Sequence, residues 1–232
     1  WPGVDPARLA RGTARAELAQ RFQLDPAARW VCMAARMQRF KGHEFFLRSL
    51  AALPTEHRDA QGIVIGAELF GLEPGYFDSL KNLAAQLGIA HRVRFTGFIS
   101  DADVHGLFAA SELLVHPALD EDFGLSIAEA LTLGTPALAF AAHGPAAILE
   151  DGETGRLVPV GDQTALDTAL ADLLSQPALL RAWGDTARQR TPARFGIAPF
   201  TRQVERIYAA CLPTRFREPC ARSEEHTSEL QS

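Results

Sequence analysis

Short apolar runs alternate with longer amphipathic stretches along most of this chain. Runs with the length and composition of buried strands occupy residues 31–34, 62–65, 93–96, 113–116 and 137–140, with a candidate for a last one at 156–160. Apolar residues recur at helical spacing in residues 9–22, 44–53, 76–87, 101–110, 126–133, 164–174, 179–189 and 200–211. Short buried strands that alternate with helices predict a parallel sheet covered on both faces.

The predicted fold is therefore α/β, a doubly wound, Rossmann-like parallel sheet in a single domain with closing helices. We expect residues 1–26 to form a linker and a first helix, and residues 27–212 to form the domain. Residues 213–232 are expected to be a disordered tail, and residues 222–232 look like the translation of a DNA-sequencing adapter. Ligands of such sheets bind at the carboxyl ends of the strands, so functional residues should follow the strands.

Composition and charge narrow the class of protein. The net charge of −5 provides no basic surface for nucleic acid or anionic lipid. No apolar run approaches the length of a membrane span. The three cysteines, Cys32, Cys211 and Cys220, match neither a disulfide framework nor the spacing of metal ligands. We therefore expect a protein of the reducing cytoplasm whose function depends on a local site.

The stretch from Glu121 to Glu129 is the strongest candidate for that site. Its two carboxylates are eight positions apart and enclose a turn, Phe123-Gly124-Leu125, that leads from an apolar run into a helical pattern. The first backbone N–H groups of a helix have no intrahelical partner and attract anions. Carboxylates beside an anion site make sense when the ligand also carries hydroxyl groups, as a nucleotide sugar does.

Cations, a glycine and an aromatic residue follow the other predicted strands. Arg36 and Lys41 come after the first strand, where Arg offers a bidentate fork to phosphate and Lys a point charge. Gly66 follows the second strand and lets the backbone approach a ligand, and a base could lie against Phe98 after the third. Each has a simpler interpretation as well: exposed loop cations, a strand-end turn and a packed phenylalanine.

The carboxylates also allow other interpretations. Ser126 and Glu129 have the spacing of a capping box. The acidic run at 120–122 suggests a divalent cation site, although such runs are more often solvated loops. A glycosidase pair needs carboxyl groups about 5–9.5 Å apart, whereas this spacing within one helix gives about 12 Å; the turn leaves the true distance open.

Other common catalytic motifs do not occur in the sequence. No G-x-S-x-G, Walker A loop or strand-borne G-x-G-x-x-G is found, which disfavours a hydrolase triad and a nicotinamide site. The histidines show no ligand spacing. His116, at the end of the fourth predicted strand, is expected to be packed or hydrogen-bonded.

The chain resembles the C-terminal, donor-binding domain of the retaining nucleotide-sugar glycosyltransferases of the two-Rossmann-domain GT-B type (glycosyl transferases group 1). The specific motif is Glu-x(7)-Glu with Phe-Gly-Leu inside it, from Glu121 to Glu129, continued by Ala-Leu-x-x-Gly-x-Pro to Pro136. Arg36 and Lys41-Gly42 match the family's Arg-x(4)-Lys-Gly. The sequence departs from the family at 143–147, where Gly-Gly-x-x-Glu is common and the acid is missing here.

The resemblance implies a role for each candidate residue. Catalytic roles fall to Arg36, Lys41 and Glu121. Donor contacts fall to Gly66, Phe98, Phe123, Gly124, Leu125 and Glu129. The cations would bind the diphosphate, Glu121 would contact the sugar, Glu129 would accept from the ribose hydroxyls, and the amides of the turn would point at phosphate. Such enzymes generally need no metal, so we expect neither a metal nor a cofactor.

The implied reaction is transfer of a sugar, with retention, from a nucleoside-diphosphate sugar to a glycan, lipid or small-molecule acceptor. The N-terminal acceptor domain of the family is not matched, so we expect the chain alone to bind nucleotide weakly and transfer sugar inefficiently. Any peripheral membrane association would come through that missing half. The alternative is a non-catalytic nucleotide-binding or interaction module that keeps the fold. An epimerase or phosphorylase of the same architecture has no support from the Phe-Gly-Leu turn.

Overall fold

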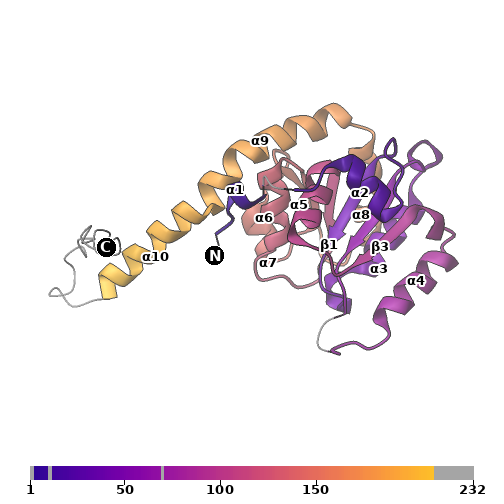
Figure 1. Cartoon of the computed structure of the whole chain (residues 1–232), viewed down its shortest axis with the longest axis horizontal. Coiled ribbons are helices and arrows are strands. Elements are labelled where there is room, and N and C mark those ends of the chain that lie inside the picture. Colours follow the sequence, from indigo (N-terminus) through magenta and orange to yellow (C-terminus); the bar gives the residue numbers. More distant parts are fainter. Residues whose placement is uncertain (1–2, 10–11, 69–70, 212–232) are drawn as a thin grey trace, which may run out of the picture.

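The computed structural model describes residues 3–9, 12–68 and 71–211, and within this part of the chain a six-stranded parallel sheet forms the centre (Figure 1). The strands are β1 (Trp30–Ala34), β2 (Gln61–Ile65), β3 (Val93–Gly97), β4 (Leu113–His116), β5 (Ala137–Phe140) and β6 (Gly155–Val158). Their order is β3-β2-β1-β4-β5-β6, and all neighbours are parallel. The predicted doubly wound, Rossmann-like fold is confirmed, and each predicted strand lies within two residues of an observed one.

Alternate residues of the four central strands β1, β2, β4 and β5 pack into separate hydrophobic cores on the two faces of the sheet. In β1, Val31 and Met33 belong to one core, whereas Trp30 and Cys32 belong to the other. The first core is covered by α3 (His43–Ala52), α4 (Tyr76–Gln86) and α8 (Gln163–Leu174), and the second by α2 (Arg15–Phe22), α5 (Asp101–Ala110) and α6 (Leu125–Leu133). Burial on both faces explains why β1, β2, β4 and β5 are continuous apolar runs, whereas the edge strands β3 and β6 include the polar residues Arg94, Thr96 and Arg156.

The C-terminal helices leave the sheet. α9 (Pro177–Phe195) packs along α6, and α10 (Ile197–Cys211) continues beyond it and extends away from the sheet (Figure 1). Val4 is buried at the junction of the two helices, where its N–H donates to Phe195 O (2.8 Å) and its carbonyl accepts from Ile197 N (2.9 Å). These hydrogen bonds fix the N-terminal segment on the C-terminal helices. None of the helices in the described residues has both the length and the apolar character needed to cross a bilayer.

Three expectations about helices need correction or addition. The segment predicted as one helix over 9–22 instead contains α1 (Pro6–Leu9) and α2. Just before α2, the N–H of Thr13 donates to Ala102 O (2.8 Å), and this hydrogen bond holds Thr13 against α5. α7 (His143–Ile148) was not predicted. Short 3₁₀ turns also occur, at η1 (Arg39–Lys41), η2 (Thr55–His57) and η3 (Ala90–Arg92). The predicted tail, 213–232, lies outside the described residues.

Candidate functional site

Lys41 reaches the carboxyl edge of the sheet on η1, directly after β1. The next residue, Gly42, has φ 80°, and a Cβ there would lie 1.8 Å from the carbonyl oxygen of Pro117. The loop after β1 therefore touches the loop after β4 so closely that only glycine fits between them. Because β1 and β4 are neighbours in the sheet, this contact brings Lys41 to the residues that follow β4.

Lys41 and Glu121 form an ion pair there. Lys41 Nζ lies 2.8 Å from Glu121 Oε2, and the two side chains are only 12% and 15% exposed. His116 Nε2 lies 3.1 Å from the same oxygen, while Oε1 has a marginal contact of 3.5 Å with the N–H of Phe123. The hydrogen bonds from His116 and Lys41 outweigh burial and lower the pKa of Glu121 to about 2. Glu121 is therefore a carboxylate throughout the neutral range.

The turn after Glu121 leads into α6, and this helix begins at a different residue from the one that a capping box would require. Gly124, with φ 93°, is the N-cap, so Ser126 is the second residue of the helix and cannot be the cap of a capping box. That interpretation is wrong. Ser126 Oγ instead lies 3.4 Å from His116 Nδ1, and the carboxyl group of Glu129 makes no hydrogen bond within the described residues.

α7 supports the same turn from the other side. The N–H of Gly144 donates to the carbonyl oxygen of Glu121 (2.8 Å). A Cβ at Gly144 would lie 2.3 Å from the carbonyl oxygen of Phe123, so the start of α7 is in close contact with the turn. The segment that departs from the family pattern thus still holds the turn in place through its backbone.

The other predicted residues at this edge differ in their surroundings. Arg36 is exposed, and its guanidinium makes no ion pair or hydrogen bond within the described residues. Gly66 packs against β1, because a Cβ there would lie 2.0 Å from Ala35 O, so this glycine is required whether or not a ligand binds. Phe98 is 84% exposed just beyond β3, which rules out the interpretation that it is a packed phenylalanine.

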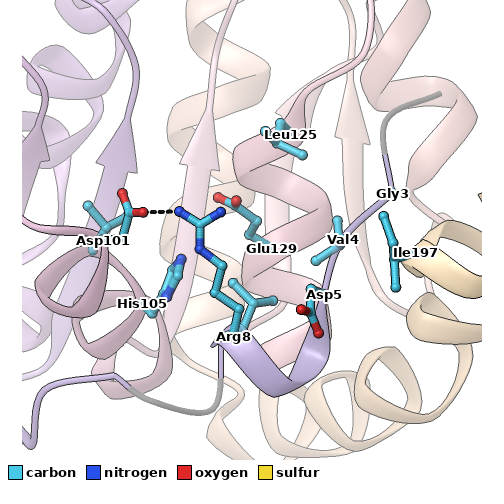
Figure 2. Close-up of a pocket in the computed structure, with 11 residues that line it drawn as sticks. Gly3, Val4, Asp5, Arg8, Asp101, His105, Leu125, Glu129 and Ile197 are labelled. Carbon is cyan, nitrogen blue, oxygen red and sulfur yellow. Dashed lines mark hydrogen bonds and ion pairs between the residues drawn. The ribbon is translucent and has the colours of Figure 1, made fainter. Parts of the chain in front are cut away.

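Glu129 lines a cavity of about 530 Å³ between α1, α5 and α6. Arg8 reaches between Asp101 and Glu129 and is ion-paired with Asp101 (Figure 2). Burial, helped by the charge of Asp101 and opposed by Arg8, raises the pKa of Glu129 to about 7. Leu125 also lines this cavity, whereas Arg36, Lys41 and Glu121 do not.

Sequence reasoning missed Arg8 and Asp101 as neighbours of Glu129. In the sequence, Asp101 is only the first residue of the predicted helix over 101–110. Ser100 is the N-cap of this helix and accepts from the N–H of Asp103. No group of three or more His, Cys, Asp or Glu side chains within the described residues is arranged to hold a metal ion, and the acidic run at 120–122 forms no such group.

Residues 14–190 match the family model described as Glycosyl transferases group 1. The chain belongs to this family. It is 33% identical over 220 residues to the D-inositol 3-phosphate glycosyltransferase of Streptomyces coelicolor, which covers 93% of this chain and 48% of that protein. It is 30% identical over 194 residues to the alpha-D-kanosaminyltransferase of Streptomyces kanamyceticus, covering 84% of this chain and 48% of that protein. The chain thus spans about half the length of these curated relatives.

Solved structures share the fold of this chain. Anabaena HepE in complex with UDP and glucose superposes with a TM-score of 0.80 at 25% identity, over 90% of this chain and 55% of that one. The C-terminal domain of the group 1 family glycosyl transferase LpcC from Francisella tularensis shares the fold, with a TM-score of 0.74 at 22% identity over 84% of this chain and 100% of that domain. The expected fold of a GT-B C-terminal domain is therefore confirmed.

Proposed function

We propose that this chain is the donor-binding half of a group 1 glycosyltransferase that transfers a sugar, with retention, from a nucleoside-diphosphate sugar. The observation that carries the proposal is the Lys41–Glu121 ion pair at the carboxyl edge of a Rossmann-like sheet, with the exposed Arg36 on the same segment after β1 as Lys41. Family membership supports it, as does the likeness to HepE, whose structures include a complex with UDP-glucose. We assign acceptor binding to the part of the relatives that this chain does not match.

The cations would act on the diphosphate. Arg36 has all its N–H donors available within the described structure, and Lys41 keeps two of its three while it holds Glu121. The N-terminus of α6, which begins at this edge, adds a partial positive charge. Negative charge grows on the diphosphate as the bond to the sugar breaks, so these groups would stabilise the transition state more than the ground state. With these charges in place, the proposed reaction requires no metal.

The two carboxyl groups would hold hydroxyl groups on either side of the diphosphate. Glu121 is ionised at neutral pH and can only accept hydrogen bonds, which suits a sugar hydroxyl. Glu129, with its pKa near 7, can accept or donate at neutral pH, and we assign it to the ribose. The exposed ring of Phe98 offers an apolar surface to the base.

Calorimetric titration with UDP, GDP, ADP and UDP-glucose tests the proposal. We expect at least one nucleoside diphosphate to bind, with UDP the first candidate because of the likeness to HepE. Glu121→Gln should reduce the affinity for the sugar nucleotide more than that for the nucleotide alone. A folded protein that binds none of the four ligands would contradict the proposal. The anomeric configuration of the product made by the whole protein tests retention.

A further inference from the structure

His116 is a buried histidine that connects two parts of the candidate site. It is the last residue of β4, and its side chain is only 2% exposed. One ring nitrogen, Nε2, lies 3.1 Å from Glu121 Oε2, and the other, Nδ1, lies 3.4 Å from Ser126 Oγ. The ring therefore joins the sugar-facing carboxylate to the first turn of α6.

The chemistry of the partners decides where the ring carries hydrogen. Glu121 is ionised at neutral pH and only accepts hydrogen bonds, so His116 Nε2 must be the donor. Nδ1 then faces the hydroxyl group of Ser126, which can donate to it. This arrangement specifies the tautomer of a neutral ring.

The two donors to Glu121 bind the same oxygen. Lys41 Nζ and His116 Nε2 both contact Oε2, at 2.8 and 3.1 Å. Among the described residues, the hydrogen-bond contact found at Oε1 is the one of 3.5 Å with the N–H of Phe123. Two donors on one oxygen fix the rotation of the carboxylate and leave the other oxygen with most of its hydrogen-bonding capacity.

We propose that His116 is a positioning residue, which holds Glu121 so that Oε1 is presented to the donor sugar and couples Glu121 to Ser126 at the start of α6. The identity of the ligand rests on the proposed function, whereas the arrangement of the side chains does not. We assign the role to this histidine because its ring contacts both Glu121 and Ser126 of α6.

The charged surroundings of Glu121 allow this role to be measured. Lys41 faces it from η1 and His116 from β4, and the adjacent loop residues Asp120 and Asp122 are exposed. His43, on α3, is near His116 and Lys41, but burial lowers its pKa to about 4, so it is neutral at neutral pH. Loss of His116 therefore removes one of two favourable partners of the carboxylate.

The first test uses the wild-type protein, so it does not depend on a variant that folds. Two-dimensional ¹H–¹⁵N spectra of the histidine side chains report which ring nitrogens carry hydrogen. We expect the His116 resonances to show hydrogen on Nε2. A neutral ring with hydrogen only on Nδ1 would overturn the proposal.

The second test compares H116Q, which keeps an N–H donor, with H116L, which has none. The carboxyl carbon of Glu121 is followed by NMR as a function of pH. H116L should raise the pKa of Glu121 by about one unit or more, the size expected for loss of such a partner, and H116Q should restore much of the shift. A purely structural histidine would leave that pKa unchanged in both variants, and this result would overturn the proposal.

Ligand binding then separates this inference from the proposed function. H116L should reduce the extra affinity of UDP-glucose over UDP by about tenfold and change the UDP affinity little, whereas H116Q should recover it. Equal losses for both ligands would overturn the claim that Oε1 is presented to the sugar. If the wild-type protein bound neither ligand, the proposed function would fail, and the two NMR tests would still decide whether His116 positions Glu121.

Discussion

Glu121 and Glu129 are of the same residue type, yet the protein pushes their pKa values in opposite directions. Two donors hold Glu121, and its pKa falls to about 2. Burial next to Asp101 raises that of Glu129 to about 7. Pairs of carboxyl groups separated in this way commonly carry different roles. We therefore assign the fixed anion to the sugar and the titratable group to the ribose.

Glu129→Gln should make the free energy of unfolding less dependent on pH. The pKa of this carboxyl group is about 7 in the folded protein and near 4.5 in the unfolded chain. Between these two pH values the folded state therefore binds a proton that the unfolded state does not. Wild-type stability should therefore fall as pH rises through this window, and the variant should lose that fall. Urea unfolding at pH 5 and pH 8 measures it, with the exposed Glu56→Gln as control. The same pH dependence in wild type and Glu129→Gln would rule out the raised pKa.

The same variant tests contact with the ribose. Glu129→Gln should weaken UDP binding by about 1.5–3 kcal/mol, the range for hydrogen bonds to charged groups. It should leave the affinity for 2′,3′-dideoxy-UDP nearly unchanged, because that ligand has no hydroxyl groups for the carboxylate to hold. Calorimetry at pH 8 gives both affinities. An equal loss of affinity for the two ligands would show that Glu129 maintains the structure of the cavity and does not contact the ribose.

Residue types at strand ends could be recognised from the sequence, but their pairing could not. The sequence predicted that Lys41 binds phosphate. It did not predict that Lys41 also pairs with Glu121, because this ion pair depends on the close contact at Gly42. His116 was expected to be packed or hydrogen-bonded, and it is hydrogen-bonded. Its partner could not be predicted, because the position of Glu121 depends on the turn.

At the scale of elements, the site depends on how closely the loops after β1 and β4 meet. Gly42→Ala should destabilise the protein well beyond the cost of its positive φ, since the new Cβ would lie 1.8 Å from Pro117 O. Gly88→Ala is a matched control, with φ 71° and nothing within 4 Å of the new Cβ. We expect a loss of about 1–2 kcal/mol for Gly88→Ala and a larger one for Gly42→Ala, measured by urea unfolding. Equal losses would show that the loops can separate without cost.

The strands could be predicted from the sequence, whereas the starts of α6 and α7 could not. Burial on both faces makes β1, β2, β4 and β5 continuous apolar runs, which a sequence shows directly. The start of α6 depends on the positive φ of Gly124, so the serine spacing that resembled a capping box was misleading. α7 has only six residues, including a glycine and a proline, and carries no periodic pattern.

At the scale of the whole molecule, the strand order explains the site. β1 and β4 are adjacent, so the loops that carry Lys41 and Glu121 converge although they are far apart in sequence. The sequence predicted a parallel sheet with functional residues at its carboxyl edge. It did not predict the cavity beside Glu129, because Arg8 reaches that cavity from an N-terminal segment held by Phe195 and Ile197.

The central claim is that Arg36 and Lys41 bind the diphosphate of the donor. Calorimetric titration of UDP and uridine against wild type, Arg36→Ala, Lys41→Ala and Arg48→Ala tests it most directly. Arg48 is an exposed cation on α3 and serves as the control for loss of a positive charge.

We expect Arg36→Ala and Lys41→Ala each to weaken UDP binding by about 1.5–3 kcal/mol, with little change for uridine and none for Arg48→Ala. Uridine carries no phosphate, so it reports contacts to the nucleoside alone. Unchanged UDP affinity in both variants, or equal losses for UDP and uridine, would contradict the claim.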